Sequence, residues 1–335
     1  MIAAMKIPSR LRALITGVTG FAGTHLAEML LADADVEVWG LWHLAQPPEL
    51  PSLRGLQTLR CDLREPACVR DVLADLRPHW IFHLAGQSDV GGSWHASWGT
   101  IESNVRGQLN LLEGMVQLGL DARILVVGSN NEYGLVSAAD LPIDEETPLR
   151  PDTPYGVSKI AQDMLGLQFF LSHQLRAVRV RCFNYIGPRQ SDKFVAGAFA
   201  RQIAEIEAGW REPVLRVGNL SAERDFTDVR DMVRAYRLAL ARCEDGEVYN
   251  IGSGRAVPIQ QLLDILLSYA RCAVRVEPDP ARLRPSDVPR SVCDATRFRA
   301  ATGWEAGIPL DQSLRDVLDF WRDKVAATNG LPVAR

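Results

Sequence analysis

Residues 17–23 read Gly17-Val18-Thr19-Gly20-Phe21-Ala22-Gly23 and stand directly after the apolar run Leu11–Thr16. The following segment, Gly23–Ala32, has apolar residues at helical spacing, so the glycines separate a predicted strand from a predicted helix. Glycines here allow a tight turn and let the backbone approach a pyrophosphate closely. The start of the helix adds free N–H groups and a partial positive charge. The stretch therefore predicts the phosphate-binding turn of a dinucleotide site.

Short apolar strands alternate with helices through the rest of the first half. The further predicted strands are Val36–Leu41, Leu56–Cys61, Trp80–Ala85, Arg123–Val127 and Ala177–Phe183, and the predicted helices lie at 67–76, around 100–118 and from near 156 onward. Such alternation is typical of a parallel sheet with helices on both faces. We predict an α/β fold with a Rossmann-type doubly wound parallel sheet and a smaller, interleaved α/β substrate domain.

The second half is less regular and indicates how the two domains alternate. Glu247–Ile251 is predicted to be a late strand of the first sheet. The cofactor domain is therefore expected to comprise residues 8–183 and about 224–252, and the substrate domain about 184–223 and 253–325. The proline-rich stretch Pro278–Pro289 predicts an extended loop over a surface or a ligand.

Composition excludes several functional classes. The chain has 335 residues, 37 Lys and Arg against 41 Asp and Glu, and a net charge of −4, so no basic surface for nucleic acid is expected. No apolar window approaches the roughly 20 residues of a membrane span, and the apolar start is too short for a secretory signal. We expect a soluble cytoplasmic protein with neither nucleic-acid nor membrane partners.

The cysteines and histidines show no metal-binding spacing. None of the six cysteines forms a CxxC pair, and their spacing fits neither a zinc site nor a disulfide framework, which predicts buried thiols in a reducing compartment. His79 and His83 would share one face of a strand without a third ligand. No metal site is expected.

Tyr155-Gly-Val-Ser-Lys159 is the most informative stretch for chemistry. Tyr and Lys at i and i+4 share one helix face, and a nearby ammonium lowers the pKa of a phenol from near ~10 toward neutrality. Ser129 follows the apolar strand Arg123–Val127, at the strand end where open α/β sheets bind ligands. We expect Ser129, Tyr155 and Lys159 to be catalytic, although a surface Tyr/Lys pair and a polar turn would show the same spacing.

Two positions bear on cofactor choice. An acidic residue at the end of the second strand would hold a ribose 2′-hydroxyl, but this sequence has Trp42-His43 there. His43 could contact a 2′-phosphate or be an ordinary surface residue, and the absence of Asp or Glu at this strand end favours NADP(H) over NAD(H). Asp62 could accept the adenine amino group, or it could cap the following helix.

At this point the chain resembles the extended short-chain dehydrogenase/reductases that act on nucleotide sugars. The residues that carry the resemblance are Thr16–Gly23, Leu84-Ala85-Gly86, Asn104-Val-Arg-Gly107, Ser129, Tyr155 with Lys159, Arg181–Pro188, Arg224–Val229 and Tyr249–Gly254. Within that family, Arg282–Pro289 is most similar to the GDP-4-keto-6-deoxymannose reductases and their relatives, the GDP-mannose 4,6-dehydratases.

The resemblance implies which residues contact cofactor and substrate. Implied cofactor contacts are Gly17, Gly20, Phe21, Ala22, Gly23, His43, Asp62, Leu63, Leu84, Ala85, Gly86, Tyr155, Lys159 and Phe183. Implied substrate contacts are Ser88, Asn131, Glu132, Asn184, Arg224 and Arg284, the two arginines being suited to a pyrophosphate. It also implies a nucleotide-sugar substrate, with GDP favoured, and a homodimer packed through the helices near 104–118 and 156–175.

Asn131 distinguishes between the reactions of the family. The resemblance places a glutamate of the 4,6-dehydratases at this position, and an amide cannot exchange protons as a carboxylate does. Glu132 is displaced by one residue and is expected to point elsewhere. Asn131 thus disfavours 4,6-dehydration and leaves hydride transfer at C4, with the direction open between a reductase and an epimerase. The resemblance of Arg282–Pro289 implies the reductase, with GDP-4-keto-6-deoxy-D-mannose as substrate and GDP-D-rhamnose as product. The alternatives are a 4-epimerase, a 4,6-dehydratase and a non-catalytic dinucleotide-binding relative.

Overall fold

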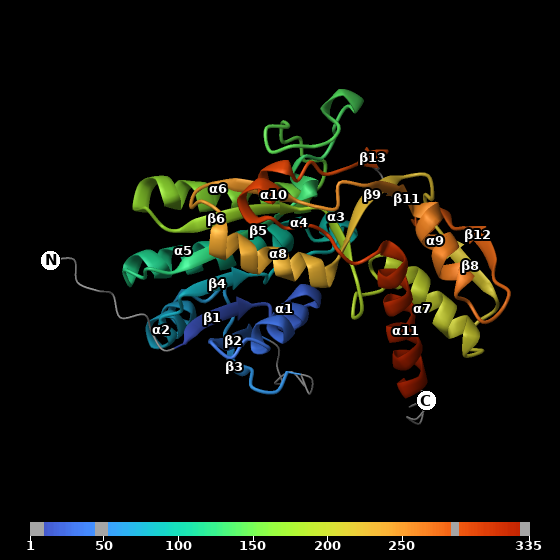
Figure 1. Cartoon of the computed structure of the whole chain (residues 1–335), viewed down its shortest axis with the longest axis horizontal. Helices are drawn as coiled ribbons and strands as arrows, with labels where there is room; N and C mark the ends of the chain where they lie inside the picture. Colours follow the sequence, from blue (N-terminus) through green and yellow to red (C-terminus); the bar gives the residue numbers. More distant parts are fainter. Residues whose placement is uncertain (1–9, 44–52, 283–287, 329–335) are drawn as a thin grey trace. The chain divides into compact units, whose positions relative to one another are not determined.

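The computed structural model describes residues 10–43, 53–282 and 288–328, which form two units (Figure 1). The first unit comprises Met1–Glu132, Thr153–Arg181 and Val233–Tyr249, and the second Tyr133–Asp152, Cys182–Met232 and Asn250–Arg335. This division differs from the expected boundaries in four places, because residues 133–152, 182–183, 224–232 and 250–252 fall in the second unit. The segment 133–152 had shown no pattern that would separate it from the strands on either side.

A seven-stranded sheet with the order β10-β6-β5-β4-β1-β2-β3 forms the centre of the first unit (Figure 1). Its strands are β1 (Leu11–Thr16), β2 (Val36–Trp42), β3 (Gln57–Arg60), β4 (Trp80–His83), β5 (Arg123–Ser129), β6 (Ala177–Cys182) and β10 (Val248–Ile251). The pairs β3–β2, β2–β1, β1–β4 and β4–β5 are parallel. The predicted Rossmann-type α/β fold is confirmed, and β10 takes the place expected for a late strand of this sheet.

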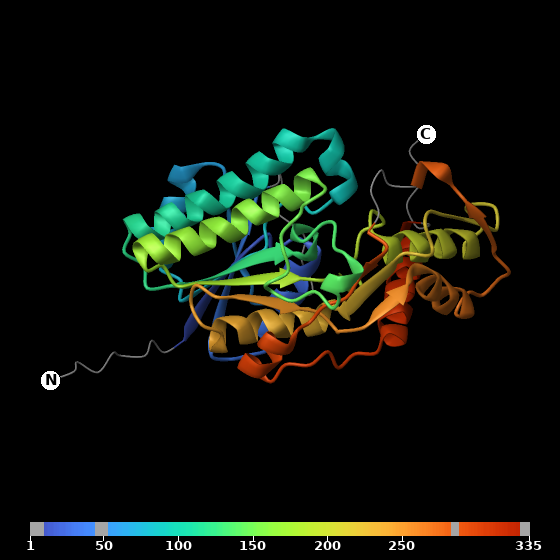
Figure 2. The same cartoon turned by 90° about the horizontal axis from the view of Figure 1, so that it is seen from above.

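Helices cover both faces of that sheet. Figure 2 shows α5 and α6 side by side on one face and α8 on the other. The helical elements here are α1 (Phe21–Leu31), α2 (Pro66–Leu76), α3 (Val90–His95), α4 (Ser97–Ile101), η1 (Glu102–Arg106), α5 (Gly107–Gln117), η2 (Asn130–Glu132), α6 (Pro154–His173) and α8 (Val229–Arg242). Fully buried Leu14, Leu73 and Leu111 belong to a cluster that joins α2 and α5 to the sheet. The strands read as continuous apolar runs because they are covered on both sides.

The helix expected around residues 100–118 is interrupted. It is divided into α4, the π-helical turn η1 and α5. The fully buried side chain of Asn104 lies in η1, where its amide bonds to groups outside the helix. Inserted turns of this kind are frequent at functional sites.

The second unit has two small sheets. Strands β7 (Asn184–Ile186), β9 (Glu223–Asp228), β11 (Ala256–Pro258) and β13 (Arg290–Ser291) form one, and β8 (Val214–Val217) and β12 (Arg275–Pro278) form the other. Its helical elements are η3 (Ala138–Asp140), α7 (Val195–Glu207), α9 (Ile259–Ser268), η4 (Pro280–Arg282), α10 (Thr296–Thr302) and α11 (Leu310–Thr328). Ile203, Leu262 and Leu318 are fully buried in a core that joins α7, α9 and α11.

Candidate active site

The glycine turn between β1 and α1 leaves no room for larger residues. Gly17 has φ +71°, and a Cβ on it would lie 2.8 Å from the Cα of Ala85. A Cβ on Gly23 would lie 2.2 Å from the carbonyl oxygen of Gly17. Gly20 stands at the N-cap of α1, so the backbone N–H groups of Phe21, Ala22 and Gly23 open the helix. This bare backbone beside a helix start fits a pyrophosphate group.

The segment after β4 lies against this turn. The N–H of Ala85 donates to Thr16 Oγ1 at 3.1 Å, and the N–H of Leu84 donates to the Thr16 carbonyl. A Cβ on Gly86 would lie 2.8 Å from Asn104 Oδ1. Leu84, Ala85 and Gly86 are therefore placed beside the glycine turn, as implied, and Ser88 follows them in an exposed position.

Asn104 ties this segment to the catalytic helix. Its Oδ1 accepts the N–H of Gln87 at 2.7 Å, and its Nδ2 donates to the Gln87 carbonyl and to Ser158 Oγ. Ser158 stands immediately before Lys159 on α6. The π-helical turn η1 therefore fixes the loop after β4 relative to the first turns of α6.

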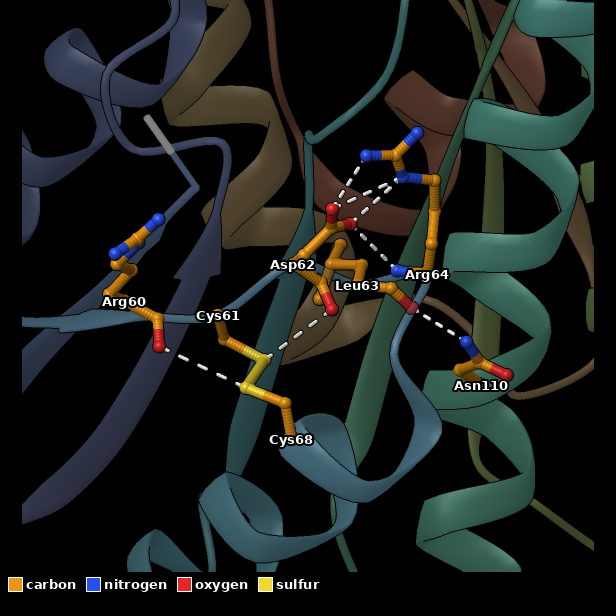
Figure 3. The surroundings of a disulfide bond; sticks show 7 residues. All are labelled: Arg60, Cys61, Asp62, Leu63, Arg64, Cys68 and Asn110. Carbon is orange, nitrogen blue, oxygen red and sulfur yellow. Dashed lines mark hydrogen bonds and ion pairs between the residues drawn. A yellow bond between two sulfur atoms is a disulfide. The ribbon is translucent and has the colours of Figure 1, made fainter. Parts of the chain in front are cut away.

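At the end of β3, Asp62 is held by a neighbour (Figure 3). Its carboxylate accepts bonds from the Nε and Nη2 of Arg64, and chiefly this contact lowers the pKa of Asp62 to about 2. The next residue, Leu63, accepts a bond from Asn110 Nδ2 at 2.7 Å. His43 lies exposed at the end of β2 and close enough to lower the pKa of Asp62 further. Both Asp62 and His43 remain predicted cofactor contacts.

The expectation for the cysteines is wrong at three positions. Cys61 and Cys68 form a disulfide that links the end of β3 to α2, and Cys272 is exposed (Figure 3). Cys182, Cys243 and Cys293 are buried thiols, as expected. The pairing depends on the turn at residues 62–65, which brings the two Cα atoms to 5.9 Å.

The three predicted catalytic residues come together in the first unit. Thr153 caps α6, so Tyr155 lies in the first helical turn and Lys159 one turn later. Lys159 Nζ lies 5.8 Å from the centre of the Tyr155 ring and donates to the Val127 carbonyl of β5 at 2.9 Å. Ser129 ends the same strand, and α6 packs against both β5 and η2.

Asn131 controls how the Ser129 hydroxyl can act. Its backbone N–H and its Nδ2 lie 3.2 and 3.0 Å from Ser129 Oγ, and both donate to it. A hydroxyl has two acceptor lone pairs and one hydrogen to donate. With both lone pairs directed at Asn131, the Ser129 hydroxyl is left to donate its hydrogen, which in this structure goes to Asn130 Oδ1 over a long distance of 3.4 Å. Asn131 thus positions Ser129, a role that the sequence did not indicate.

Glu132 is buried beneath the site. It is 0% exposed, and its Oε1 accepts the backbone N–H of Ser129 at 2.7 Å while Oε2 lies 3.2 Å from Arg181 Nε. Arg181 and Arg179 are themselves buried and share the carboxylate of Asp163. The interpretation of Glu132 as a substrate contact is contradicted by this burial, because its carboxylate faces the interior. The expectation that it points elsewhere holds.

Burial and the charge of Asp163 raise the pKa of Glu132 from 4.5 to about 8. A carboxyl with a raised pKa binds more protons in the folded state, so its contribution to stability is lost as pH rises toward that pKa. Between about pH 5 and about pH 8, the unfolding free energy of the wild-type protein is therefore expected to fall more steeply with pH than that of Glu132→Gln. Urea unfolding at several pH values measures this. Equal slopes for both proteins would contradict it, since Asp225 and Glu145, whose pKa values are also raised, are present in both.

The second unit contains most of the remaining predicted residues. Asn184 begins β7 and Arg224 lies on the neighbouring strand β9, where Asn184 pairs with Phe226. Phe183 is buried in a cluster with Tyr133 and Cys293, so its contact with a cofactor stays a prediction. Arg284 lies outside the described residues. Among the described residues, no cluster of three metal-ligating side chains occurs, and no helix is long and apolar enough to span a membrane.

Three residues near the site were not singled out from the sequence for a role there. His83, Gln162 and Asp163 are at most 3% exposed and lie behind Lys159 and Ser129. Gln162 and Asp163 follow Lys159 by three and four positions on α6, which indicates a shared helix side. Only the packing against β4 and β6 shows what they contact.

Sheet order, glycine turn and the Tyr155–Lys159 pair are those of a Rossmann-type dinucleotide-binding oxidoreductase. Residues 14–317 match the family described as GDP-mannose 4,6 dehydratase, and the chain belongs to that family. The family resemblance is thereby confirmed.

The chain is similar to one protein sequence and two solved structures that indicate the chemistry of the family. The chain is 37% identical to the GDP-6-deoxy-D-mannose reductase of Pseudomonas aeruginosa, over 94% of this chain and 98% of that protein. The solved structure of RMD from Pseudomonas aeruginosa complexed with NADPH is 35% identical, with a TM-score of 0.81 over 94% of this chain and 99% of the other. The UDP-glucose 4-epimerase of Thermus thermophilus in complex with NAD is 30% identical, with a TM-score of 0.82 over 93% and 99%.

Proposed function

We propose that the protein reduces the C4 keto group of GDP-4-keto-6-deoxy-D-mannose with NADPH and forms GDP-D-rhamnose. One observation carries the choice of reaction: Asn131 replaces the carboxylate that dehydration needs and is engaged in holding Ser129. The similarity to a GDP-6-deoxy-D-mannose reductase supports both the substrate and the direction.

The cofactor would bind along the turn at Gly17–Gly23, with Leu84–Gly86 beside it and Asp62 and Leu63 at the adenine end. NADPH is favoured because His43 stands where an acidic residue would select NADH, and because a similar structure holds NADPH. A similar epimerase holds NAD, so the preference for NADPH is part of the proposal. When bound, the nicotinamide supplies the hydride that reduces C4.

Gly23→Ala tests the turn. The new Cβ would lie 2.2 Å from the Gly17 carbonyl oxygen, so the turn must open and the backbone N–H groups must move away from the pyrophosphate. We expect NADPH affinity, measured by fluorescence titration, to fall at least about tenfold, or about 1.4 kcal/mol. Gly99→Ala is the matched control, because a Cβ there meets no atom within 4 Å. Equal NADPH affinity for the two variants would contradict this role of Gly23.

The side chains divide the chemistry at C4 between them. Ser129 donates its hydrogen to the C4 oxygen, since Asn131 occupies its lone pairs. Tyr155 gives its phenolic proton to that oxygen as it becomes an alkoxide. Lys159, held by the Val127 carbonyl near the ring, favours the phenolate that Tyr155 leaves behind. In the second unit, Asn184 and Arg224 are proposed to bind the substrate, and the guanidinium of Arg224 suits its pyrophosphate.

A coupled assay tests the reaction. Purified protein, NADPH and GDP-4-keto-6-deoxy-D-mannose are expected to give GDP-D-rhamnose with loss of NADPH absorbance. UDP- and dTDP-linked 4-keto sugars serve as comparisons for the base. Failure to oxidise NADPH or NADH with all three sugars would disprove the proposal.

A 4-epimerase is the second candidate, because the similar Thermus structure carries that name. An epimerase returns the hydride to the same carbon and needs no added cofactor. It would purify with tightly bound dinucleotide and interconvert a saturated nucleotide sugar. A 4,6-dehydratase would instead convert GDP-mannose, and a non-catalytic relative would bind dinucleotide without turnover. An absorbance spectrum of the purified protein and incubation with GDP-mannose separate these outcomes.

We also propose a cytoplasmic homodimer that packs through α5 and α6. Val157, Met164 and Leu171 are 47%, 38% and 65% exposed at seven-residue spacing on α6, and Val116 of α5 is also exposed. Figure 2 shows these two helices side by side. Such a stripe suits helix packing against a second copy.

Leu171→Glu is expected to convert the dimer to a monomer, because it places a charge at the most exposed apolar residue of this stripe. Light scattering after size-exclusion chromatography measures the mass. Trp210→Glu, which charges an exposed aromatic residue of the second unit, is expected to leave the mass unchanged. A monomeric wild-type protein, or a dimeric Leu171→Glu variant, would contradict this interface.

A further inference from the structure

A buried line of polar side chains runs from the catalytic lysine to the end of β1. Lys159 Nζ donates to Gln162 Oε1 at 2.9 Å, Gln162 Nε2 lies 3.3 Å from His83 Nε2, and His83 Nδ1 lies 2.9 Å from Thr16 Oγ1. Gln162 is 1% exposed, His83 3% and Thr16 0%. Thr16 is the residue before Gly17, so the line joins the catalytic helix to the start of the phosphate turn.

The chemistry of the donors fixes the direction of every bond in this line. An ammonium can only donate, so Lys159 requires the oxygen of the Gln162 amide. The NH₂ group of Gln162 is then left facing His83 Nε2 and needs a lone pair there. His83 must therefore be neutral with its hydrogen on Nδ1, which donates to Thr16 Oγ1. Thr16 Oγ1 also accepts the N–H of Ala85, which uses its second lone pair.

The surroundings maintain that state of His83. Burial and the charge of Lys159 lower the pKa of His83 to about 3. The charged groups that bear on this line are the Lys159 ammonium and the Glu132 carboxyl, which interacts with Lys159 from η2. An imidazolium would turn an N–H toward the NH₂ group of Gln162 and break the line.

From these contacts we propose that His83 and Gln162 are positioning residues that hold the Lys159 ammonium beside Tyr155. His83 orients the Gln162 amide, and that amide anchors Lys159 together with the Val127 carbonyl. If the amide turned over, it would present NH₂ to the ammonium and displace it. This inference rests on the proposed role of Tyr155 and Lys159, but its main tests need neither substrate nor turnover.

The first test observes His83 directly in the protein without substrate. In protein carrying ¹⁵N-labelled histidine, the ring nitrogens of His83 are assigned by the signals that disappear in His83→Gln. We expect the neutral form with hydrogen on Nδ1 throughout the range from about pH 5 to about pH 8. Hydrogen on Nε2, or an imidazolium within that range, would overturn the inference.

The second test compares two amide replacements of the same ring. Gln at position 83 presents its amide near the place of Nε2 and can still accept from Gln162, whereas Asn reaches only the place of Nδ1 and keeps the bond to Thr16. Both variants lose the ring and its packing. We expect His83→Asn to raise the apparent pKa of Tyr155 by about one unit relative to His83→Gln, because the ammonium is less well held. Tyrosinate absorbance, taken as a difference against Tyr155→Phe in each background, measures this shift.

Activity adds a separate measurement. His83→Asn is expected to lower kcat about tenfold more than His83→Gln and to move the alkaline limb of its pH profile upward. Gln162→Met gives the same comparison if the His83 variants do not fold. If they do fold, adding His83→Asn to Gln162→Met is expected to change the Tyr155 titration no further. Equal Tyr155 titrations for His83→Asn and His83→Gln, or for Gln162→Met and wild type, would overturn the inference. If the wild-type protein did not reduce the 4-keto sugar although the Tyr155 titrations shifted as expected, the proposed substrate would be wrong and the positioning role of His83 and Gln162 would stand.

Discussion

Tyr155→Phe is expected to lower kcat for reduction of the 4-keto sugar by at least about 100-fold, because the variant loses the proton that neutralises the new alkoxide. The ring is only 7% exposed and lies beside the Lys159 ammonium, and phenylalanine preserves its shape and packing. NADPH affinity and thermal stability are therefore expected to change little. Single-turnover kinetics with NADPH measure the chemical step separately from product release.

The matched control is Tyr269→Phe. This tyrosine lies in the second unit, and its hydroxyl donates to the carboxylate of Asp311 at an exposed position. The same chemical change there is expected to leave kcat unaltered. If Tyr155→Phe kept most of its activity while Tyr269→Phe behaved like wild type, another group would have to supply the proton.

Asp163→Asn is expected to lower the free energy of unfolding by about 3–5 kcal/mol, the range measured when one partner of a buried ion pair is removed. The carboxylate is 2% exposed and accepts from Arg179 Nη1 at 2.7 Å and from Arg181 Nη2 at 2.7 Å. Without its charge, Arg181 would keep Glu132 as a carboxyl partner, while Arg179 would keep the carbonyl oxygen of Gly246. Urea unfolding monitored by tryptophan fluorescence measures the loss.

Asp121→Asn provides the comparison on the surface of the same unit. Its ion pair with Arg176 spans 3.2 Å, but the carboxylate is 72% exposed and Arg176 also pairs with Asp245. A change below about 1 kcal/mol is expected there. If Asp163→Asn cost no more than Asp121→Asn, burial would not be what makes the Asp163 pair important.

The Asp163 group also has a role in the catalytic site. Arg181 links it to Glu132, and Glu132 accepts the backbone N–H of Ser129. The end of β5 is thus connected to α6 through Glu132, Arg181 and Asp163. A second connection is made by Lys159 of α6, whose Nζ donates to the Val127 carbonyl of β5. Ser129 and Tyr155 are held from two separate elements, which is the arrangement that precise positioning requires.

Local chemistry was sufficient to predict the strands, the phosphate turn and the Tyr155–Lys159 pair. A buried strand reads as an apolar run, a turn against a backbone requires glycine, and an i, i+4 pair shares a helix face wherever the helix lies. Helix α8 carries a strong amphipathic pattern and was not anticipated. The break at η1 was also missed, because Asn104 leaves the regular helix for partners that are distant in sequence.

Glu132 shows why the sequence alone does not predict the direction of every side chain. Asn131 and Glu132 lie in the short 3-10 turn η2, where each residue is rotated by about 120° from the one before. A shift of one residue along η2 therefore decides whether a side chain faces the active site or the protein interior. The residues of β6 and α6 that pack against η2 determine which of the two directions is the interior. The sequence indicated that Glu132 would not replace a catalytic glutamate, but it did not reveal Arg181 as its partner.

The sequence by itself determined that this chain forms the parallel sheet of a dinucleotide-binding fold. It also determined that Ser129 follows a buried strand and that Tyr155 and Lys159 share one face of a helix. Those features follow from periodicity and from residues adjacent in the chain. Tertiary structure alone decided that Asn131 occupies the lone pairs of Ser129, that Cys61 meets Cys68, and that His83 and Gln162 lead from Lys159 to Thr16. The reason is physical. A hydrogen bond between side chains tolerates a deviation of only a few tenths of an ångström in the donor–acceptor distance, and only packing sets that distance between separate elements.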